Sequence, residues 1–518
     1  MTLKPQLPLR LLSSPFIIIV ACVALFVLVW ATVPFDSEIP NNVYNSLSLN
    51  KPKTSRVHNL IWASKPVLPF CAGLASKLAT RYPIPTMLGY EGSGEFNLTG
   101  GYNIAKLYTL RRYLNGPAGA HDDDLVIATD SYDVLAQLPV DAFIERYFET
   151  AAAADKHLAD RFGITVEEAH SKGLRQTVFF SAGAKCFPPF PDEAQCWALP
   201  PSNLPHNILG PERDGPSEAF YADPIFVNAG IMIGPVGDLR KVVDAALELV
   251  AEIWDPEIKF IATSDQHYIG KVMGRQEVYR TKEITGGPVP GLTGTRVLPK
   301  EKQNETDQTE FHMTVDHAHG LVQNRAYFEY WLRKLNFDRS DHTAVVMEDV
   351  LNQQRSFQPY KIQMPSFVFL ALRRIFDSIS DQIDQGSTAK EWIGSLKLGT
   401  NVATRQIFAL FHQSGKKDGF MEYYQDMWYF PYLKRMLKAA VEANRAREPL
   451  TTRLIDGRNW VSQTNYPEDR SLHDDYGGAY ADSPNEFIPF LQLCKEYTRD
   501  LFGMEHQGGM DQETKINV

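Results

Sequence analysis

Apolar and polar positions alternate along the chain in two rhythms, one typical of buried strands and one typical of amphipathic helices. Short apolar runs predict strands over residues 59–64, 84–90, 124–130, 176–182 and 224–235. Apolar positions spaced three and four apart predict helices over residues 71–82, 103–114, 141–158 and 237–254. Strands and helices in turn are typical of an α/β fold, a Rossmann-like, mainly parallel sheet flanked by helices. Ligands of such sheets bind at the carboxyl ends of the strands.

The alternation is interrupted in the second half of the chain. Residues 335–400 mix short helical and extended patterns, and we interpret them as an insertion into a domain that spans residues 57–435. The run "RQIFALFH" at residues 405–412 then resumes a strand pattern. The aromatic-rich residues 436–518 are interpreted as a cap on the same domain.

The N-terminal region predicts one membrane-spanning helix, assigned to residues 15–35. Residues 16–35 carry no charge and, at a rise of about 1.5 Å per residue, span roughly 30 Å, the thickness of a bilayer core. Basic residues precede the run and acidic residues follow it, which predicts a cytosolic tail at residues 1–14. Residues 36–56 are polar and aperiodic and predict a stem that leads to a lumenal domain. The alternative, a cleaved signal peptide, is disfavoured because the apolar run is longer than usual.

Charge and cysteines are consistent with this placement in the secretory pathway. A net charge of -10 over 518 residues, without a long basic block, argues against a nucleic-acid partner. Lumenal cysteines oxidise readily, and four lie beyond the predicted span: Cys71, Cys186, Cys196 and Cys494. Two N-glycosylation sequons, at Asn97 and Asn304, also suit a lumenal domain. Cys186 and Cys196 are close enough in sequence to close a short loop, whereas the other pairing stays open.

The stretch "LVIATDSYDVL" carries the first candidate chemistry. Asp130 ends a predicted buried strand and Asp133 follows three residues later. An unbroken strand would aim these two carboxylates to opposite faces, so they share a site only if the chain leaves the extended conformation at Ser131. Such a pair could then supply carboxylates to a hard divalent cation, and Tyr132 between them could contact a nucleobase or ribose. The alternative is an ordinary turn without a ligand.

A second candidate follows the strand pattern at residues 405–412. His412 is followed by Ser-Gly-Lys-Lys, in which Gly415 supplies a flexible backbone and Lys416 and Lys417 supply positive charge. This combination suits a metal ligand beside a bound diphosphate. Taken by themselves, these residues are more typical of a surface histidine beside a basic turn.

Three more polar residues are ambiguous from the sequence. Asp265 suits a catalytic carboxylate and equally suits a helix N-cap. Asn228 suits a sugar contact through its amide or a strand turn, and Lys106 suits a donor contact or a solvated helix face. The group Asp316, His317 and His319 has metal-ligating residue types, and we interpret its histidines as incidental.

Seven sequence blocks resemble, in the same order, the glycosyltransferase domain of the procollagen lysyl hydroxylase/glycosyltransferases and the related collagen galactosyltransferase-like proteins. The resemblance covers about residues 58–333 and 401–435. Its blocks are "MLGY" with "GGYNIAKLYTLRRYL", "IATDSYDVL", "VFFSAGAKCFP", "FVNAGIMIG", "SDQHYIG", "MTVDHAHGLVQN" and "IFALFHQSGKK".

The resemblance implies a GT-A fold, a UDP-sugar donor and manganese. Asp130, Asp133 and His412 would be the metal ligands and Tyr132 a uridine contact. Gly415 with Lys416 or Lys417 would contact the diphosphate. The family's "FSAE" glutamate is Gly183 here and its "CW" tryptophan is Phe187. Both positions lie near where an acceptor would bind, so the resemblance predicts the donor substrate better than the acceptor.

These observations together predict a type II membrane glycosyltransferase of the Golgi or endoplasmic reticulum. It would transfer glucose or galactose from a UDP-sugar to a protein-linked or glycan-linked hydroxyl, with Asp265 and Asn228 acting at the reacting centre. One rival is a phosphohydrolase with Asp130 as nucleophile, which would require a second aspartate at the position of Tyr132. The other is a non-catalytic lumenal scaffold with the same fold, which the changes at Gly183 and Phe187 leave open.

Overall fold

The computed structural model describes residues 52–92, 103–210, 220–289, 291–302, 304, 306–350, 357–472 and 474–503. The predicted cytosolic tail, the membrane span at residues 15–35, residues 36–51 of the stem and Asn97 lie outside these residues. Asn304 is described and exposed. Within the described ranges, none of the helices is both long enough and apolar enough to cross a bilayer.

A nine-stranded sheet forms the centre of the unit that begins at Lys53. Its order is β17 (Asn485–Pro489), β16 (Gly478–Asp482), β2 (Thr86–Leu88), β1 (Lys53–Trp62), β3 (Leu125–Asp130), β6 (Phe226–Pro235), β5 (Val178–Gly183) and β7 (Met313–Val315), and β15 (Arg458–Ser462) also pairs with β1. The predicted α/β architecture is confirmed, since most pairings are parallel. β6 departs from it by running antiparallel to both β3 and β5.

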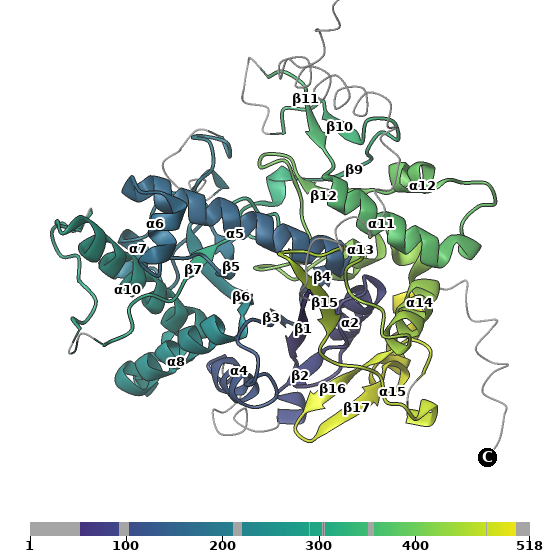
Figure 1. Ribbon diagram of the computed structural model, residues 1–518, viewed down its shortest axis with the longest axis horizontal. Helices are drawn as coiled ribbons and strands as arrows, with labels where there is room; N and C mark the ends of the chain where they lie inside the picture. The colour runs from purple at the N-terminus through teal and green to yellow at the C-terminus, as the bar shows by residue number, and fades with distance from the viewer. Residues whose placement is uncertain are drawn as a thin grey trace, which may run out of the picture. The chain divides into compact units, whose positions relative to one another are not determined.

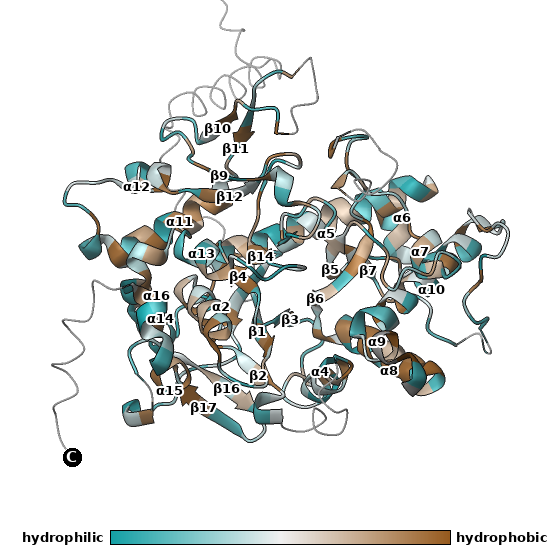
Figure 2. Cartoon of the chain, turned by 180° about the vertical axis from the view of Figure 1, so that it is seen from behind, coloured by the Kyte–Doolittle hydropathy of each residue, from teal (hydrophilic) through white to brown (hydrophobic). Residues whose placement is uncertain are grey.

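Helices cover both faces of this sheet because strand residues alternate between the two faces. On β1, Val57 and Ile61 pack with α2 (Leu68–Ala79) and α5 (Val140–Phe162). Leu60 and Trp62 face the other way. They pack with α4 (Ala105–Asn115), α8 (Val236–Ile253) and α10 (Asp265–Thr285). The strands lie between these helices in Figure 1, and Figure 2 shows β5, whose residues are mostly apolar, largely in brown.

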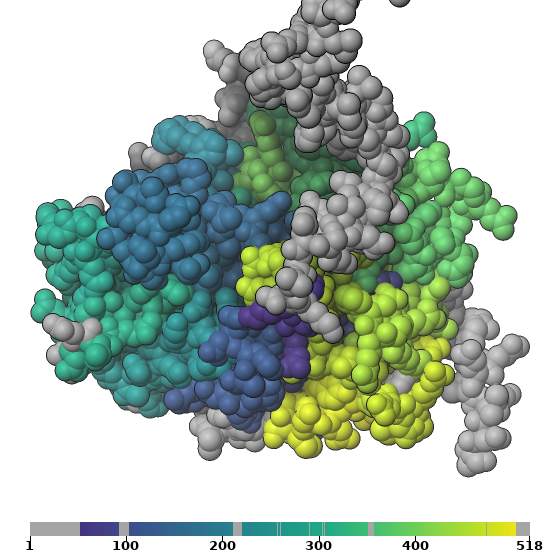
Figure 3. All heavy atoms as spheres, viewed as in Figure 1, coloured from purple at the N-terminus to yellow at the C-terminus, as the bar shows by residue number. Residues whose placement is uncertain are grey.

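The C-terminal residues are part of the central sheet, which corrects the interpretation of residues 436–518 as a cap. β15 pairs in parallel with the first half of β1, and β16 pairs in parallel with β2. Figure 3 shows the consequence, with the yellow C-terminal segment against the purple N-terminal one. β1 also begins at Lys53, inside the predicted stem, because residues 53–57 find their partner in β15.

The insertion, together with the residues that flank it, contributes two small sheets and two helices. β10 (Thr343–Val346) pairs with β11 (Tyr360–Gln363), and β12 (Leu398–Asn401) lies between β9 (Leu332–Leu335) and β13 (Gln406–Ile407). Buried residues of α11 (Ser366–Ile379) and α12 (Ala389–Ser395) belong to the same hydrophobic core as α2 and α5. The insertion is therefore packed into the domain.

A third small sheet places the histidine candidate. The predicted strand at residues 405–412 is divided into β13 and β14 (Leu410–His412), and β14 lies between β4 (Val134–Ala136) and β8 (Val322–Asn324). The remaining helices are α6 (Val166–Ser171), α7 (Ala194–Trp197), α9 (Lys259–Ala262), α13 (Phe420–Gln425), α14 (Leu433–Arg445), α15 (Phe490–Cys494) and α16 (Thr498–Phe502).

Two disulfides join described cysteines. Cys186 pairs with Cys196, the short loop that the sequence allowed. Cys71 of α2 pairs with Cys494 of α15 across 423 residues of sequence, which ties the C-terminal segment to the first helix.

Candidate metal centre

The chain leaves the extended conformation at Ser131. This is the condition under which Asp130 and Asp133 can face the same site. β3 ends at Asp130, and β4 begins one residue after Asp133. The hydroxyl of Ser131 donates to the carbonyl of Trp62 (2.5 Å), which holds the turn against the end of β1. The Tyr132 hydroxyl accepts from the backbone N–H groups of Ser64 (3.1 Å) and Lys65 (3.2 Å). These contacts turn Asp133 back toward Asp130.

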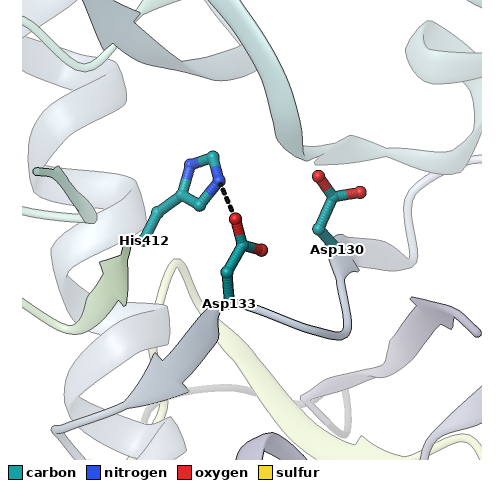
Figure 4. Close-up of side chains that lie close together, drawn as sticks. All are labelled: Asp130, Asp133 and His412. Carbon is teal, nitrogen blue, oxygen red and sulfur yellow. Dashed lines mark ion pairs between the residues drawn. The ribbon is translucent and has the colours of Figure 1, made fainter. Parts of the chain in front are cut away.

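Asp130, Asp133 and His412 converge at this turn. One ligand atom from each lies within 4.8 Å of the others (Figure 4). Nε2 of His412 is 3.2 Å from Oδ2 of Asp133, and its Nδ1 is buried with no hydrogen-bond partner among the described residues. Two carboxylates and an imidazole are a donor set that fits a divalent cation. The group can therefore hold a metal ion.

Two lysines contact the same carboxylates. Nζ of Lys106, on α4, donates to Oδ1 of Asp130 (2.5 Å) and lies 3.6 Å from Oδ2 of Asp265. Nζ of Lys417 donates to Oδ2 of Asp133 and to the backbone carbonyl of Gln413 (2.9 Å). The structure thus brings Asp265, Lys106 and Lys417 to the candidate metal group.

These charges shift the pKa values of their neighbours. Burial alone would raise the pKa of Asp133, but the charges of His412 and Lys417 hold it well below its usual range. Burial would lower the pKa of Lys106, yet Asp130 and Asp265 raise it above its usual value. Burial raises the pKa of Asp265, and Lys106 offsets only part of that increase. Perturbed pKa values gathered at a strand end are typical of functional sites.

Gly230 lies against the metal group and cannot carry a side chain without disturbing it. A Cβ atom there would lie 2.4 Å from Cε1 of His412 and 3.1 Å from Oδ2 of Asp130. The register of β5 against β6 shifts here, because Phe180 pairs with Met232 and Ser181 with Asn228. Such bulges re-aim the backbone beside active sites.

Asn228 lies at this bulge, and Asp265 lies on α10, whose Gln266 side chain accepts from the backbone N–H of Ala229 (3.3 Å). The Asn228 side-chain oxygen accepts from the backbone N–H of Gly230 (3.2 Å). Asp265 is the first residue of α10, where Ser264 takes the N-cap position, and its Oδ1 accepts from the N–H of Gln266 (2.9 Å). Asp265 therefore is not the N-cap that the sequence left open as an alternative.

The segment after His412 forms a turn over the site. Gly415 has a φ of 78°, in the left-handed region that favours glycine. The Gln413 side chain donates to the carbonyl of Asp418 (2.8 Å) and closes the turn. Lys416 is exposed, and its carbonyl accepts from the Arg325 guanidinium (3.1 Å).

Asp316, His317 and His319 do not form a second metal group. Oδ2 of Asp316 accepts from the backbone N–H groups of Leu321 and Val322. A ring nitrogen of His317 bonds to the carbonyl of Pro224 (2.9 Å), whereas His319 packs on another ring, 4.3 Å between centroids. Elsewhere in the described part of the chain, no other group of three candidate ligands comes together.

No protein-family model matches this chain, and no curated protein matches it at a significant level.

Two residues of the site were not predicted from the sequence. Gly230 stood inside the block "FVNAGIMIG", where the glycine was a visible but unused signal. Lys77 lies on the predicted helix at residues 71–82 and is 2% exposed beneath the site. Its Nζ donates to the hydroxyl of Thr129, next to Asp130. Burial lowers the pKa of Lys77 to about 7, although the negative charge of Asp130 opposes the shift.

Replacing Gly230 by alanine is expected to weaken Mn²⁺ binding roughly 10- to 100-fold, because the new methyl group displaces His412 and Asp130. Isothermal titration of the full chain with Mn²⁺ measures this affinity. Gly183→Ala is the matched control, since a Cβ there lies 3.4 Å from its nearest neighbour and clear of the site. Equal Mn²⁺ affinity in Gly230→Ala and the parent would contradict the assigned ligands.

The buried Lys77 predicts a pH dependence of stability. Its folded pKa of about 7 lies below the unfolded value of about 10.4, so the unfolded chain binds the proton more tightly. Below pH 7 Lys77 is charged in the folded protein, and burying that charge lowers the free energy of unfolding by its full amount. As pH rises from 7 toward 10, this destabilisation disappears and the free energy of unfolding increases. Lys77→Met removes this contribution and should raise Tm more, relative to the parent, at pH 6 than at pH 9.

Thermal unfolding of parent and variant at both pH values provides the measurement. Lys156→Met, at an exposed position of α5, is the control and should show the same difference from the parent at both pH values. A Lys77→Met difference that is also independent of pH would show that the lysine stays charged in the folded protein.

Proposed function

We propose that this chain is a metal-dependent glycosyltransferase of the GT-A type that transfers a hexose, glucose or galactose, from a UDP-sugar. The observation that carries the proposal is the convergence of Asp130, Asp133 and His412 at the carboxyl end of a parallel strand. The three residues come from sequence blocks that resemble the donor site of the collagen-modifying glycosyltransferases. Ligands of α/β sheets bind at this edge.

The cation class follows from the donor set. Two carboxylates and one imidazole fit Mn²⁺, and the buried Nδ1 of His412 leaves Nε2 as the nitrogen that faces the carboxylates. When bound, the ion would supply positive charge to offset the leaving diphosphate.

Lys106 and Lys417 have a defined role in this proposal. Their ammonium groups neutralise Asp130 and Asp133 in the protein alone. With a cation held by those carboxylates, the ammonium groups of Lys106 and Lys417 would be free to contact the diphosphate oxygens. Lys417 is well placed for this change, because its side chain is 57% exposed. Gly415 and Lys416 present the turn from which Lys417 extends.

The remaining site residues face the sugar and the nucleoside. Tyr132 is fixed through its hydroxyl and is half-buried against the core, so we assign the exposed part of its ring to uridine. Asp265 has a raised pKa and suits a group that accepts the proton of the acceptor hydroxyl as the new C1–O bond forms. Asn228 orients the Gly230 backbone, so we assign it to positioning of the sugar.

The cellular placement is part of the proposal. A signal anchor at residues 15–35 would hold the domain in the Golgi or endoplasmic reticulum lumen, facing protein or glycan acceptors. The pairings Cys71–Cys494 and Cys186–Cys196 suit an oxidising compartment.

The alternative is a non-catalytic lumenal scaffold, favoured by glycine at position 183 and phenylalanine at position 187. A scaffold would have no need for Asp265 beside Lys106 and Asp130, and burying three carboxylates together is costly without a ligand. We therefore rank the enzyme first.

UDP release tests the proposal. The full chain should release UDP from UDP-glucose or UDP-galactose with Mn²⁺, and release should stop with a chelator, because slow donor hydrolysis accompanies transferases that lack an acceptor. Asp130→Asn and Asp133→Asn should reduce release to background, since each removes a ligand charge. Asp123→Asn, at an exposed position before the same strand, should keep full release.

Full release in Asp130→Asn or Asp133→Asn would end the metal-site assignment. Absence of Mn²⁺-dependent release from every UDP-sugar tried would favour the scaffold. The expressed chain must include Lys53, because β1 pairs with β15 from that residue onward.

A further inference from the structure

A groove of about 710 Å³ opens where the insertion meets the loop at residues 203–210. Aromatic and polar side chains share its walls, among them Trp331, Phe357, Tyr360, Thr404, Arg405 and Gln406. Its volume lies within the range of small-molecule sites, about 300–1,000 Å³. A second cavity of about 200 Å³ adjoins it and shares Asn203, Ala318 and Gln406.

Two buried polar groups in the groove walls have no partner within the described ranges. They are Nε1 of Trp331 and the hydroxyl of Thr404, and each residue is 8% exposed. Buried donors are nearly always hydrogen-bonded in folded proteins, because leaving one unpaired costs stability. Both residues line the groove, but the two atoms themselves are not accessible to solvent, so a ligand in the groove would pair with them after a small rotation of each side chain.

The aromatic wall is fixed in place. The Arg405 guanidinium lies 4.7 Å from the ring centroid of Tyr360, and the Tyr360 hydroxyl donates to the carbonyl of Val402 (2.7 Å). Arg405 has a φ of 59°, in the left-handed region that is unfavourable for a non-glycine residue. Backbone strain of this kind collects at binding sites.

A buried hydrogen-bond chain connects the groove to the candidate metal centre. The Ser414 hydroxyl, two residues after His412, donates to the side chain of Asn324. The neighbouring Gln323 accepts from the side chain of Asn401 (3.0 Å). Asn401 in turn accepts from the backbone N–H of Thr404 (3.1 Å). The wall that carries Thr404 is therefore built on the same frame as the metal ligand.

A short chain segment also limits the separation of the two sites. The backbone N–H of Arg325 donates to the carbonyl of His412 (2.9 Å), and Trp331 follows six residues later. Six residues span at most about 20 Å even when fully extended. One extended ligand can therefore reach from the groove to the metal centre.

We propose that this groove binds a saccharide, the glycan portion of the acceptor. The inference rests on the proposed function, since it names the acceptor class of that site. Sugar hydroxyls both donate and accept, so they can pair with the Thr404 hydroxyl and accept from the Trp331 indole. The ring faces of a pyranose suit the flat surfaces of Phe357 and Tyr360. A bare polypeptide would instead favour an open strand edge or apolar side-chain pockets.

Direct titration with three neutral trisaccharides, mannotriose, cellotriose and galactotriose, tests the inference. The full chain should bind at least one of these trisaccharides in a buffer that contains a chelator and no UDP-sugar. Thr404→Val and Trp331→Phe each delete one unpartnered donor, so each should weaken binding roughly five-fold. Their Tm should stay equal to or above that of the parent, because no internal hydrogen bond is lost.

Thr451→Val is the matched control. It removes another buried, unpartnered hydroxyl, at 6% exposure, outside the residues that line the groove, and should bind like the parent. Serine-rich and lysine-rich peptides serve as comparators. Binding of a peptide but of no trisaccharide, binding of none of the probes, or unchanged trisaccharide binding in both groove variants would overturn the inference.

The design separates this inference from the proposed function. Asp133→Asn should lose UDP release and keep trisaccharide binding, because the groove is titrated without metal or donor. UDP release without trisaccharide binding would overturn only the inference that the groove binds a saccharide. Trisaccharide binding without UDP release would support the saccharide groove and contradict the proposed glycosyltransferase function.

Discussion

Three carboxylates held close together at the end of one strand are the constraint on which the rest of the site depends. Asp133 and Asp265 are almost completely buried, and the Asp130 side chain is 25% exposed. Like charges in a buried site repel each other and raise their pKa values unless cations offset them. Lys106 and Lys417 provide that offset from two different parts of the chain. The site is therefore a balanced charge cluster that a divalent cation can enter by replacing ammonium contacts.

The sequence predicted the parts of this arrangement that are local. The strand that ends at Asp130 was visible as an apolar run, and the break at Ser131 followed from requiring two aspartates three residues apart to face one space. His412 was placed by the order of resembling blocks, and its strand β14 pairs with β4 just after Asp133.

Other parts could not be predicted because they depend on partners far away in the sequence. β1 begins at Lys53 only because β15, some four hundred residues later, pairs with it, and the same pairing turns the expected cap into part of the sheet. The role of Gly230 arises from a shift in register between β5 and β6. The spacing of apolar residues along the sequence does not reveal such a shift. Lys77 is polar at a buried position of α2, where the helix pattern alone favours an apolar residue.

The insertion is integrated with the site through buried amides. Asn324, Gln323 and Asn401 form a continuous hydrogen-bonded path, and each is almost fully buried. Satisfied polar networks of this kind rigidify a core and fix one arrangement of its elements. The candidate metal centre and the groove thus share one hydrogen-bonded frame, as the proposed transfer from a donor to an acceptor would require.

The central claim is that Asp130, Asp133 and His412 bind a divalent cation. Crystals soaked with Mn²⁺ and measured at the manganese absorption edge test it most directly. The account predicts one anomalous peak between the three side chains, with Lys106 and Lys417 no longer in contact with the two aspartates. An absent peak, or a peak elsewhere with both lysine contacts retained, would contradict it.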